Sequence, residues 1–288
     1  MKKISVISVL LCLLLCLVGC NSAEDTQIVA TTKPVYQFTS LLCQNTPINV
    51  ELLISDNVSC LHDYTLQVSQ MQKLEEAELI VINGAGFEDF LSDVLPAGKQ
   101  IVDCSQGIAL HCNTQHSHDD THSHETDPHI WLSIPNAKKM AQTIYTDLCV
   151  YYPEYEEIFA NNHSVLVAAF SSLEKESSAL TNLSNKEIIT FHDGFSYLAD
   201  MFNLHIVKAI EEESGSEASA RELIEIIREI NTHSIPAIFT EVSGSASAPS
   251  IIQAETNVKV SALDMGLSER DYFEAMKYNI LTLKEALE

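Results

Sequence analysis

The stretch PEYEEIFANNHSVLVAAFSSLEKESSALTNL, residues 153–183, limits which architecture the rest of the sequence can adopt. Its first residue is a proline, which helices favour at their first position, and no glycine or second proline interrupts the remaining residues of the stretch. A helix of this length would extend about 45 Å at the usual rise of about 1.5 Å per residue. Such a helix is too long for one small α/β unit, so we predict a rigid strut between two domains.

The sequence on both sides of this strut alternates between short apolar runs and helical patterns. Before the strut, we expect strands over 26–31, 48–54, 78–82 and 100–103 and helices over 34–44, 64–77, 87–95 and 136–152. After it, we expect strands over 187–191, 205–210, 236–241 and 258–263 and helices over 195–202, 217–232, 246–256 and 269–287. Such alternation is typical of parallel sheets covered by helices. The sequence therefore predicts an α/β fold with two parallel-sheet lobes joined by one long rigid helix.

The first residues of the chain are typical of a secretory signal. Lys2 and Lys3 precede an apolar run that is shorter than the roughly 20 residues of a membrane span. The run ends in Leu-Val-Gly before Cys20, an order that resembles the lipobox of bacterial lipoproteins and makes Cys20 the expected lipidation site. A plain signal peptide with a chance cysteine is the alternative. We expect the following boundaries: signal peptide 1–19, lipidated tether 20–25, N-terminal lobe 26–152, linker helix 153–183 and C-terminal lobe 184–288.

Charge and cysteine content narrow the classes of function. Removing residues 1–19 takes away two lysines and no acid, so 16 basic residues become 14 against 40 acidic ones and the formal charge goes from -24 to -26. This balance argues against nucleic acid as a partner, because such binding depends on basic residues. Of the eight cysteines, two lie within residues 1–19, and five remain besides Cys20 once that segment is removed. The sequence has no CxxC motif, which argues against a cysteine-rich zinc cluster. Their pairing stays open for Cys43, Cys60, Cys104, Cys112 and Cys149, with a Cys104–Cys112 bridge as one possibility.

Several residues that can bind a metal follow the expected strands. His62 comes after the strand over 48–54 through a polar turn, and His192 and Asp264 follow their strands directly. His129 leads into an apolar Ile-Trp-Leu run. Ligands of open α/β sheets bind outside the carboxyl ends of strands, so these side chains can converge in a cleft between the lobes. Three imidazoles and one carboxylate suit zinc. Each histidine taken alone is more often a hydrogen-bonded loop residue than a ligand.

Short motifs surround these residues in a fixed order. They are His62-Asp63-Tyr64, Asn83-Gly84-Ala85-Gly86-Phe87-Glu88, Asp127-Pro128-His129-Ile130-Trp131-Leu132, Phe191-His192-Asp193-Gly194-Phe195-Ser196-Tyr197, Phe239-Thr240-Glu241 and Leu263-Asp264. In order and spacing they resemble the motifs of the metal-binding lipoproteins of zinc and manganese ABC importers. The resemblance covers nearly all of residues 26–288. It implies two α/β lobes bridged by one rigid helix, with the metal between the lobes.

The resemblance also implies roles for individual residues. Matched position by position, the family's metal ligands fall on His62, His129, His192 and Asp264, and Glu241 is expected to support the ligands without touching metal. The manganese-binding relatives have a carboxylate at the position of His192, so the histidine favours the zinc branch. The family often has proline after its Asp, whereas Met265 stands here. This departure leaves open whether Asp264 or a water is the fourth ligand.

A loop rich in histidine interrupts the N-terminal lobe. Residues 104–128 show neither a helical nor a strand period, and a loop of this length is usually functional or disordered. Its segment 111–125 resembles the His-rich loop of the zinc-binding family members. The resemblance and the composition predict an auxiliary, weak metal-binding loop formed by His116, His118, His122 and His124. A solvated linker that happens to be polar is the alternative.

The function that the resemblance implies is transport of a metal and not catalysis. We expect a monomeric protein that captures Zn²⁺ as the transported ligand and delivers it to the membrane permease of an ABC importer. We expect it on the extracellular or periplasmic face of the cell membrane, held by its lipid anchor only. The alternatives are a binding protein for manganese or another divalent metal, a zinc-dependent hydrolase and a surface adhesin. The sequence contains no HExxH motif and no nucleophile elbow, and no residue supports the adhesin.

Overall fold

The computed structural model of the protein describes residues 27–55, 64–92, 94–95, 98–112, 126–180, 185–210 and 219–288. Several predictions concern residues outside these ranges. They are the signal peptide and tether with Cys20, the candidate ligand His62, and the loop histidines His116, His118, His122 and His124.

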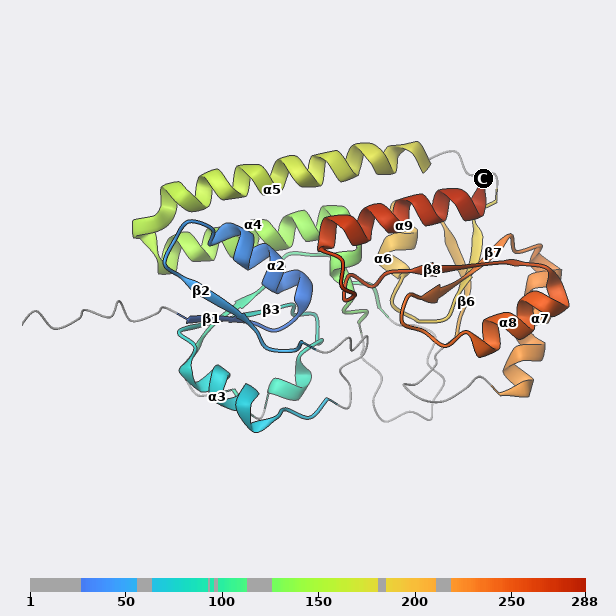
Figure 1. Cartoon of the computed structure of the whole chain (residues 1–288), viewed down its shortest axis with the longest axis horizontal. Helices are drawn as coiled ribbons and strands as arrows, with labels where there is room; N and C mark the ends of the chain where they lie inside the picture. The colour runs from blue at the N-terminus through green and yellow to red at the C-terminus, as the bar shows by residue number, and fades with distance from the viewer. Residues whose placement is uncertain are drawn as a thin grey trace, which may run out of the picture.

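The N-terminal lobe is built on a four-stranded parallel sheet of order β2-β1-β3-β4. Its strands are β1 (Gln27–Ala30), β2 (Asn49–Leu52), β3 (Leu79–Ile82) and β4 (Gln100–Asp103). Helices α2 (Lys33–Leu42) and α4 (Ile134–Tyr151) lie on one side of the sheet and α3 (Val68–Glu76) on the other (Figure 1). The central strands β1 and β3 are almost continuously apolar and buried, as expected where helices cover both faces of a sheet.

The C-terminal lobe repeats this topology. Its parallel sheet has the order β6-β5-β7-β8, so in both lobes the second strand lies at the edge and the first strand pairs with the third. The strands are β5 (Glu187–Thr190), β6 (His205–Ala209), β7 (Ala237–Glu241) and β8 (Lys259–Leu263), and the helices are α6 (Ser196–Met201), α7 (Ala220–His233), α8 (Ser247–Thr256) and α9 (Tyr272–Leu287). The predicted fold class, two parallel-sheet α/β lobes, is confirmed.

One long helix runs along both lobes. Residues 156–177 form α5 (Glu156–Ser177), a helix of 22 residues, with the 3-10 turns η3 (Pro153–Tyr155) and η4 (Ser178–Leu180) at its two ends. The regular helix is therefore about 33 Å long, shorter than the sequence pattern suggested. Figure 1 shows α5 running along the top of the molecule, above α4 of the N-terminal lobe and α9 of the C-terminal lobe. The predicted domain boundaries themselves stay a prediction.

The C-terminal helix provides a second connection between the lobes. Tyr272, at the start of α9, is buried and packs edge-on against Phe38 of α2, with ring centroids 4.8 Å apart. Its hydroxyl donates a hydrogen bond of 2.8 Å to the carbonyl of Trp131, and its backbone N–H donates to Gln37. The helix that follows the last strand of one lobe thus begins inside the other lobe. These contacts fix the two sheets relative to each other, and with them the residues at the carboxyl ends of their strands.

The predicted helix over 87–95 contains only a single 3-10 turn, η1 (Asp89–Leu91), among the residues described. The backbone of Gly84, Ala85 and Gly86 has positive φ angles, which produces a loop after β3. This loop is held by Glu88, whose carboxylate accepts hydrogen bonds from the backbone N–H groups of Asn83 and Gly84. Local hydrogen bonding to a side chain therefore competes with helix formation here.

Two further observations concern cysteines and membranes. Within the part of the chain that the structure describes, Cys43, Cys104, Cys112 and Cys149 are all free thiols, so no bridge joins Cys104 to Cys112. In the same ranges, every helix is too short or too polar for a membrane span.

Candidate metal centre

His129 is held in place by a short turn that leads into a buried 3-10 helix. The residues of η2 (Ile130–Leu132) are fully buried, and Trp131 donates a hydrogen bond of 2.6 Å from its indole nitrogen to the carbonyl of Met265. Asp127 Oδ1 accepts a hydrogen bond of 2.9 Å from the backbone N–H of His129 and lies 2.8 Å from Nδ1 of the same residue. Two contacts to one carboxylate oxygen therefore fix both the backbone and the ring of His129.

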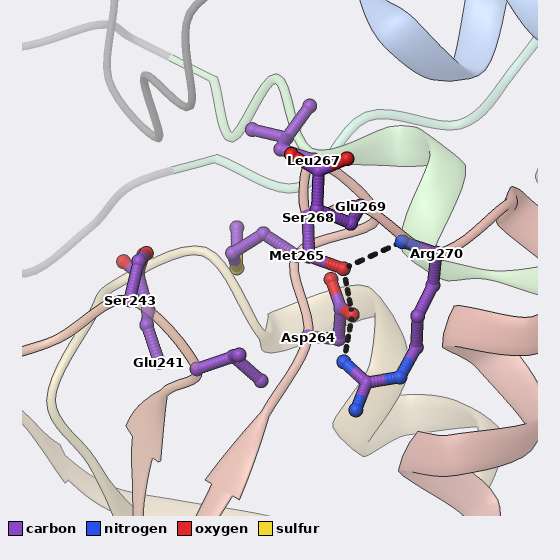
Figure 2. Close-up of a pocket in the computed structure, with 9 residues that line it drawn as sticks. Glu241, Ser243, Asp264, Met265, Leu267, Ser268, Glu269 and Arg270 are labelled. Atoms are coloured by element: carbon purple, nitrogen blue, oxygen red, sulfur yellow. Dashed lines mark hydrogen bonds and ion pairs between the residues drawn. The ribbon is translucent and has the colours of Figure 1, made fainter.

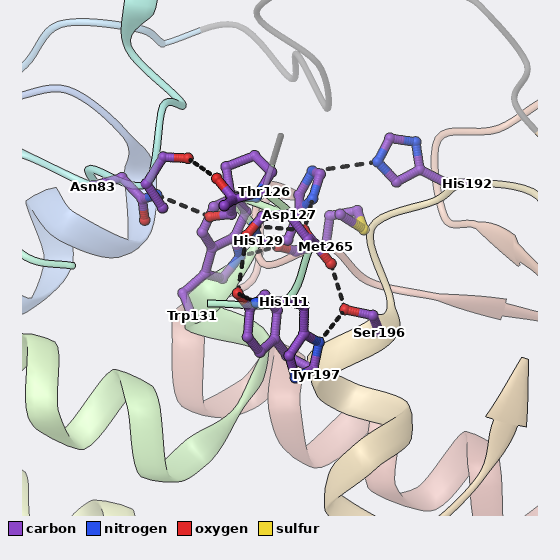
Figure 3. A network of polar contacts seen from close by, with 12 residues as sticks. Asn83, His111, Thr126, Asp127, His129, Trp131, His192, Ser196, Tyr197 and Met265 are labelled. Carbon is purple, nitrogen blue, oxygen red and sulfur yellow. Dashed lines mark hydrogen bonds and ion pairs between the residues drawn. The ribbon is translucent and has the colours of Figure 1, made fainter. Parts of the chain in front are cut away.

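The segment before His129 is anchored by the loop after β3. The side-chain amide of Asn83 donates a hydrogen bond of 2.9 Å to the carbonyl of Pro128 (Figure 3). Asn83 is itself fully buried at the carboxyl end of β3. The motif over residues 83–88 thus supports, through Asn83, the Asp-Pro-His turn that precedes the buried 3-10 helix.

His192 is positioned by the neighbouring lobe. It follows β5, and its Nδ1 lies 3.0 Å from Oε1 of Glu241, the last residue of β7. Strands β5 and β7 pair in parallel, so their carboxyl ends adjoin and bring this histidine and this carboxylate together. Both side chains are largely buried. Each of the two candidate ligands therefore has a carboxylate at Nδ1.

The two imidazole rings meet between the lobes. Nε2 of His129 and Nε2 of His192 lie 3.3 Å apart, and the rings are nearly perpendicular, at 89° (Figure 3). Gly194 makes this approach possible, because a Cβ atom on Gly194 would lie 2.7 Å from His192 Nε2 and 2.9 Å from His129 Cε1. The glycine two residues after His192 is thus a steric requirement of the paired histidines.

Asp127 is a buried carboxylate with several donors. It is 1 % exposed, and its second oxygen, Oδ2, accepts a hydrogen bond from the Ser196 hydroxyl of α6. Burial alone raises the pKa of Asp127, but the hydrogen bond and the charge of His129 and the hydrogen bond from Ser196 lower this pKa below its ordinary value. A charged Asp127 favours the His129 tautomer with hydrogen on Nδ1, which directs the Nε2 lone pair toward His192.

Asp264 lies at the end of β8, as predicted, but its carboxylate is engaged elsewhere. Oδ1 accepts a hydrogen bond of 2.8 Å from the backbone of Gly266, and Oδ2 lies 3.1 Å from Nη1 of Arg270 and accepts a hydrogen bond from Ser268. Figure 2 shows the contacts of Asp264 with Ser268 and Arg270 beside a cavity of about 550 Å³ that Glu241 also lines. The Asp264 carboxylate is buried, at 1 % exposure, and paired with a cation.

The structure therefore brings together His129, His192 and Glu241 among the predicted site residues. It does not place Asp264 in a ligand cluster with them, and in the described ranges no group of three or more His, Cys, Asp or Glu side chains is arranged to hold a metal ion. His62 lies outside those ranges. The motifs of the sequence predicted no role for Asp127 or Ser196. The role of Asp127 could have been inferred from its position two residues before His129, because Asp side chains commonly accept hydrogen bonds from the backbone two residues further on.

Comparison with protein families places the chain among zinc-uptake proteins. The family model described as "Zinc-uptake complex component A periplasmic" matches residues 28–286. The chain is 30% identical to the zinc-binding lipoprotein AdcA of Streptococcus pneumoniae (strain ATCC BAA-255 / R6), over 99% of this chain and 61% of that protein. It is 26% identical to the high-affinity zinc uptake system protein ZnuA of Bacillus subtilis (strain 168), over 93% of this chain and 89% of that one. The chain thus spans about three fifths of the pneumococcal relative's length.

Solved structures agree with these relatives. A crystal structure of ZnuA matches with a TM-score of 0.78 at 26% identity, over 92% of this chain and all of that chain. The Zn(II)-bound ZnuA-like domain of Streptococcus pneumoniae AdcA matches with a TM-score of 0.79 at 26% identity, over 91% and 99% of the two chains. Since the family model covers nearly the whole sequence, the chain belongs to the family of periplasmic zinc-uptake components, which are substrate-binding proteins of ABC transporters and not enzymes.

Proposed function

We propose that this protein captures Zn²⁺ between its two lobes and delivers it to the membrane permease of an ABC importer. The separation of 3.3 Å between the Nε2 atoms of His129 and His192 carries the proposal. With Zn–N bonds of about 2.0–2.1 Å and a tetrahedral angle of about 109°, two nitrogens on one zinc ion lie about 3.3 to 3.4 Å apart. The two rings are therefore spaced as ligands of a single tetrahedral ion.

The carboxylates behind the histidines support this proposal. Asp127 and Glu241 each contact Nδ1 of one histidine, at 2.8 Å and 3.0 Å, which leaves Nε2 to face the metal. Carboxylates in this position orient the imidazole and raise its basicity as a ligand. Imidazole ligands favour zinc over manganese, and the zinc-binding relatives point in the same direction.

Two further ligands complete the proposed tetrahedral set. We assign the third position to His62, which follows β2 in sequence. The fourth belongs to Asp264 or to a water. Ligation by Asp264 requires its carboxylate either to share its lone pairs between the metal and its present donors or to exchange one of those donors, because Arg270 Nη1 lies 3.1 Å from Oδ2 and the Gly266 N–H donates to Oδ1. A water as fourth ligand requires no such exchange.

Attachment and transfer are further parts of the proposal. The pneumococcal relative is named as a lipoprotein, which supports lipidation of Cys20 and a position on the outer face of the cell membrane. We propose the permease partner and the monomeric state because of the family to which the chain belongs. We propose the weak auxiliary site because the segment that holds it is rich in histidine; its ligands are His116, His118, His122 and His124. Changing those four histidines to Ser should remove weak zinc equivalents in a calorimetric titration and preserve one tight site.

The central test is a set of alanine variants titrated with zinc against a competing chelator. His62→Ala, His129→Ala and His192→Ala should each weaken zinc binding by more than about 100-fold, beyond the roughly 10- to 100-fold that losing an outer partner costs. His205→Ala is the matched control, because His205 is exposed at the opposite end of the C-terminal sheet. Equal losses at all four positions would show that the cleft is not the zinc site. Metal analysis of protein purified without added metal separates zinc from manganese as the natural cargo.

A further inference from the structure

His111 lies outside the predicted ligand set, yet it contacts residues of both lobes next to the candidate metal centre. Two backbone contacts tie its segment to the residues just before His129. The N–H of Asp127 donates a hydrogen bond of 2.9 Å to the carbonyl of His111, and Cys112 forms an antiparallel bridge with Thr126. His111 therefore sits beside Asp127 although the two are distant in sequence (Figure 3).

The side chain of His111 packs on helix α6 of the C-terminal lobe. Its ring stacks on Tyr197 with centroids 4.0 Å apart and planes at 12°. Nδ1 lies 2.9 Å from the Ser196 hydroxyl, and Nε2 lies 3.2 Å from a carboxylate oxygen of Asp200. One aromatic face and both ring nitrogens thus contact three residues of a single helix, which is a specific fit and not a chance surface contact.

The directions of these hydrogen bonds follow from the number of protons available. Ser196 has one hydroxyl proton and donates it to Asp127 Oδ2, so the contact with His111 requires a proton on His111 Nδ1. Tyr197 accepts a hydrogen bond of 3.0 Å from the backbone N–H of His111 and donates one of 3.0 Å to the carbonyl of Asp127. Two parallel paths therefore run from His111 through α6 to Asp127, and Asp127 in turn holds His129 Nδ1.

We propose that His111 is a positioning residue of the metal centre, which acts through Ser196 and Asp127 to orient His129 and to hold the two lobes together beside it. The inference rests on the proposed function in one respect, that His129 binds the metal. A ligand held by a fixed network binds metal more tightly than one that must be ordered on binding. Loss of the His111 side chain should therefore loosen Asp127 and reorient the His129 ring.

Three substitutions separate the contacts of His111. All are made with His116, His118, His122 and His124 changed to Ser, so that the cleft is measured without the auxiliary histidines. His111→Phe retains an aromatic ring to stack on Tyr197 and loses both polar contacts. His111→Gln places its amide near the position of Nε2, and His111→Asn places its amide N–H near the position of Nδ1, where it can donate to Ser196.

The measurements are zinc affinity by chelator competition, the visible absorption spectrum of the Co²⁺-loaded protein and thermal unfolding without metal. His111→Phe and His111→Gln should weaken zinc binding about tenfold and change the Co²⁺ spectrum. His111→Asn should have a zinc affinity and a Co²⁺ spectrum close to those of the parent. His205→Phe makes the same chemical change at an exposed remote site and should change neither. The proposal would be overturned if all His111 variants had the zinc affinity and the Co²⁺ spectrum of the parent. It would also be overturned if zinc affinity fell only in proportion to the fall in melting temperature.

A double-mutant cycle tests the path through Ser196. If His111 acts through this hydroxyl, Ser196→Ala should also weaken zinc binding, and adding His111→Phe should cost little more. Fully additive losses would show that His111 does not act through Ser196. If His129→Ala leaves the tight site intact, the proposed function fails. If His129→Ala abolishes the site while His111→Phe has no effect, only the present inference fails.

Discussion

Nη1 of Arg270 lies 3.1 Å from Oδ2 of Asp264, the carboxylate that the sequence predicts as a metal ligand. The guanidinium also lies over the ring of Tyr278, 4.2 Å from its centroid. Asp264 is almost fully buried, and its backbone is tied to Asn279 of α9 by two hydrogen bonds, of 2.7 Å and 2.8 Å. Arg270 and a metal ion would therefore compete for one carboxylate.

Replacing Arg270 should separate the structural and the metal-binding roles of Asp264. Arg270→Gln should lower the free energy of unfolding of the metal-free protein by about 1–3 kcal/mol, since a buried carboxylate loses a charged hydrogen-bond donor. Zinc affinity should stay the same or increase, because the competing cation is gone. Urea unfolding and chelator competition measure the two quantities. A tenfold weaker zinc affinity would mean that the ion pair supports the site and does not compete with it.

Adding one methyl group at Gly194 should weaken metal binding without unfolding the protein. The new Cβ of Gly194→Ala would lie 2.5 Å from His192 Cδ2 and 2.9 Å from His129 Cε1, so at least one ring must shift. We expect a zinc affinity at least about tenfold weaker, as for other losses of ligand orientation. Gly98→Ala is the control, because it strains a backbone with φ of +85° but meets no atom within 4 Å. The control should lose stability and retain zinc affinity, and the opposite pattern would contradict the steric assignment.

Metal preference should depend on the side chain at position 192. His192→Glu replaces an imidazole by a harder carboxylate, which should lower the ratio of zinc to manganese affinity, even if zinc still binds more tightly. The new carboxylate would face Glu241, which lies 3.0 Å from His192 Nδ1, so the double variant His192→Glu with Glu241→Gln removes the repulsion. Competition between the two metals measures the ratio. An unchanged or higher ratio in both variants would refute the prediction.

The stability of the metal-free protein should vary with pH through Glu88. Burial raises the pKa of Glu88 to about 7, against the opposing hydrogen bonds from Thr31, Asn83 and Gly84. The folded state thus binds this proton more tightly than the unfolded state, whose glutamates titrate near 4.3. The resulting stabilisation is complete below about pH 4 and is lost as the pH rises through about 7, with an upper limit of about 4 kcal/mol.

Glu88→Gln provides the comparison, since it does not titrate. The difference in unfolding free energy between the natural protein and Glu88→Gln should decrease from pH 5 to pH 7.5 in urea denaturation with chelator present. Other titrating groups cancel in this difference. A constant difference over that range would show that Glu88 has the same pKa in the folded and unfolded states.

The positions of most strands and helices could be predicted because they depend on local periodicity. Strand β4, for instance, has the predicted ends, Gln100 and Asp103, and β3 differs by one residue. The helix expected over 87–95 was wrong in extent, because the Glu88 carboxylate binds the backbone of the preceding loop. Hydrogen bonds between a side chain and the backbone leave no periodic signal that could have indicated this.

Chain order and apolar period are properties of neighbouring residues, so they were enough to predict two α/β lobes with His129 and His192 near the carboxyl ends of strands. They could not predict that the Nε2 atoms of these histidines lie 3.3 Å apart, that Asp127 and Glu241 hold their Nδ1 atoms, or that Arg270 pairs with Asp264. The distance between the two histidines depends on how one lobe packs against the other, through α6 and the buried start of α9. Such packing joins residues that are far apart in sequence, and the sequence pattern carries no measure of those distances.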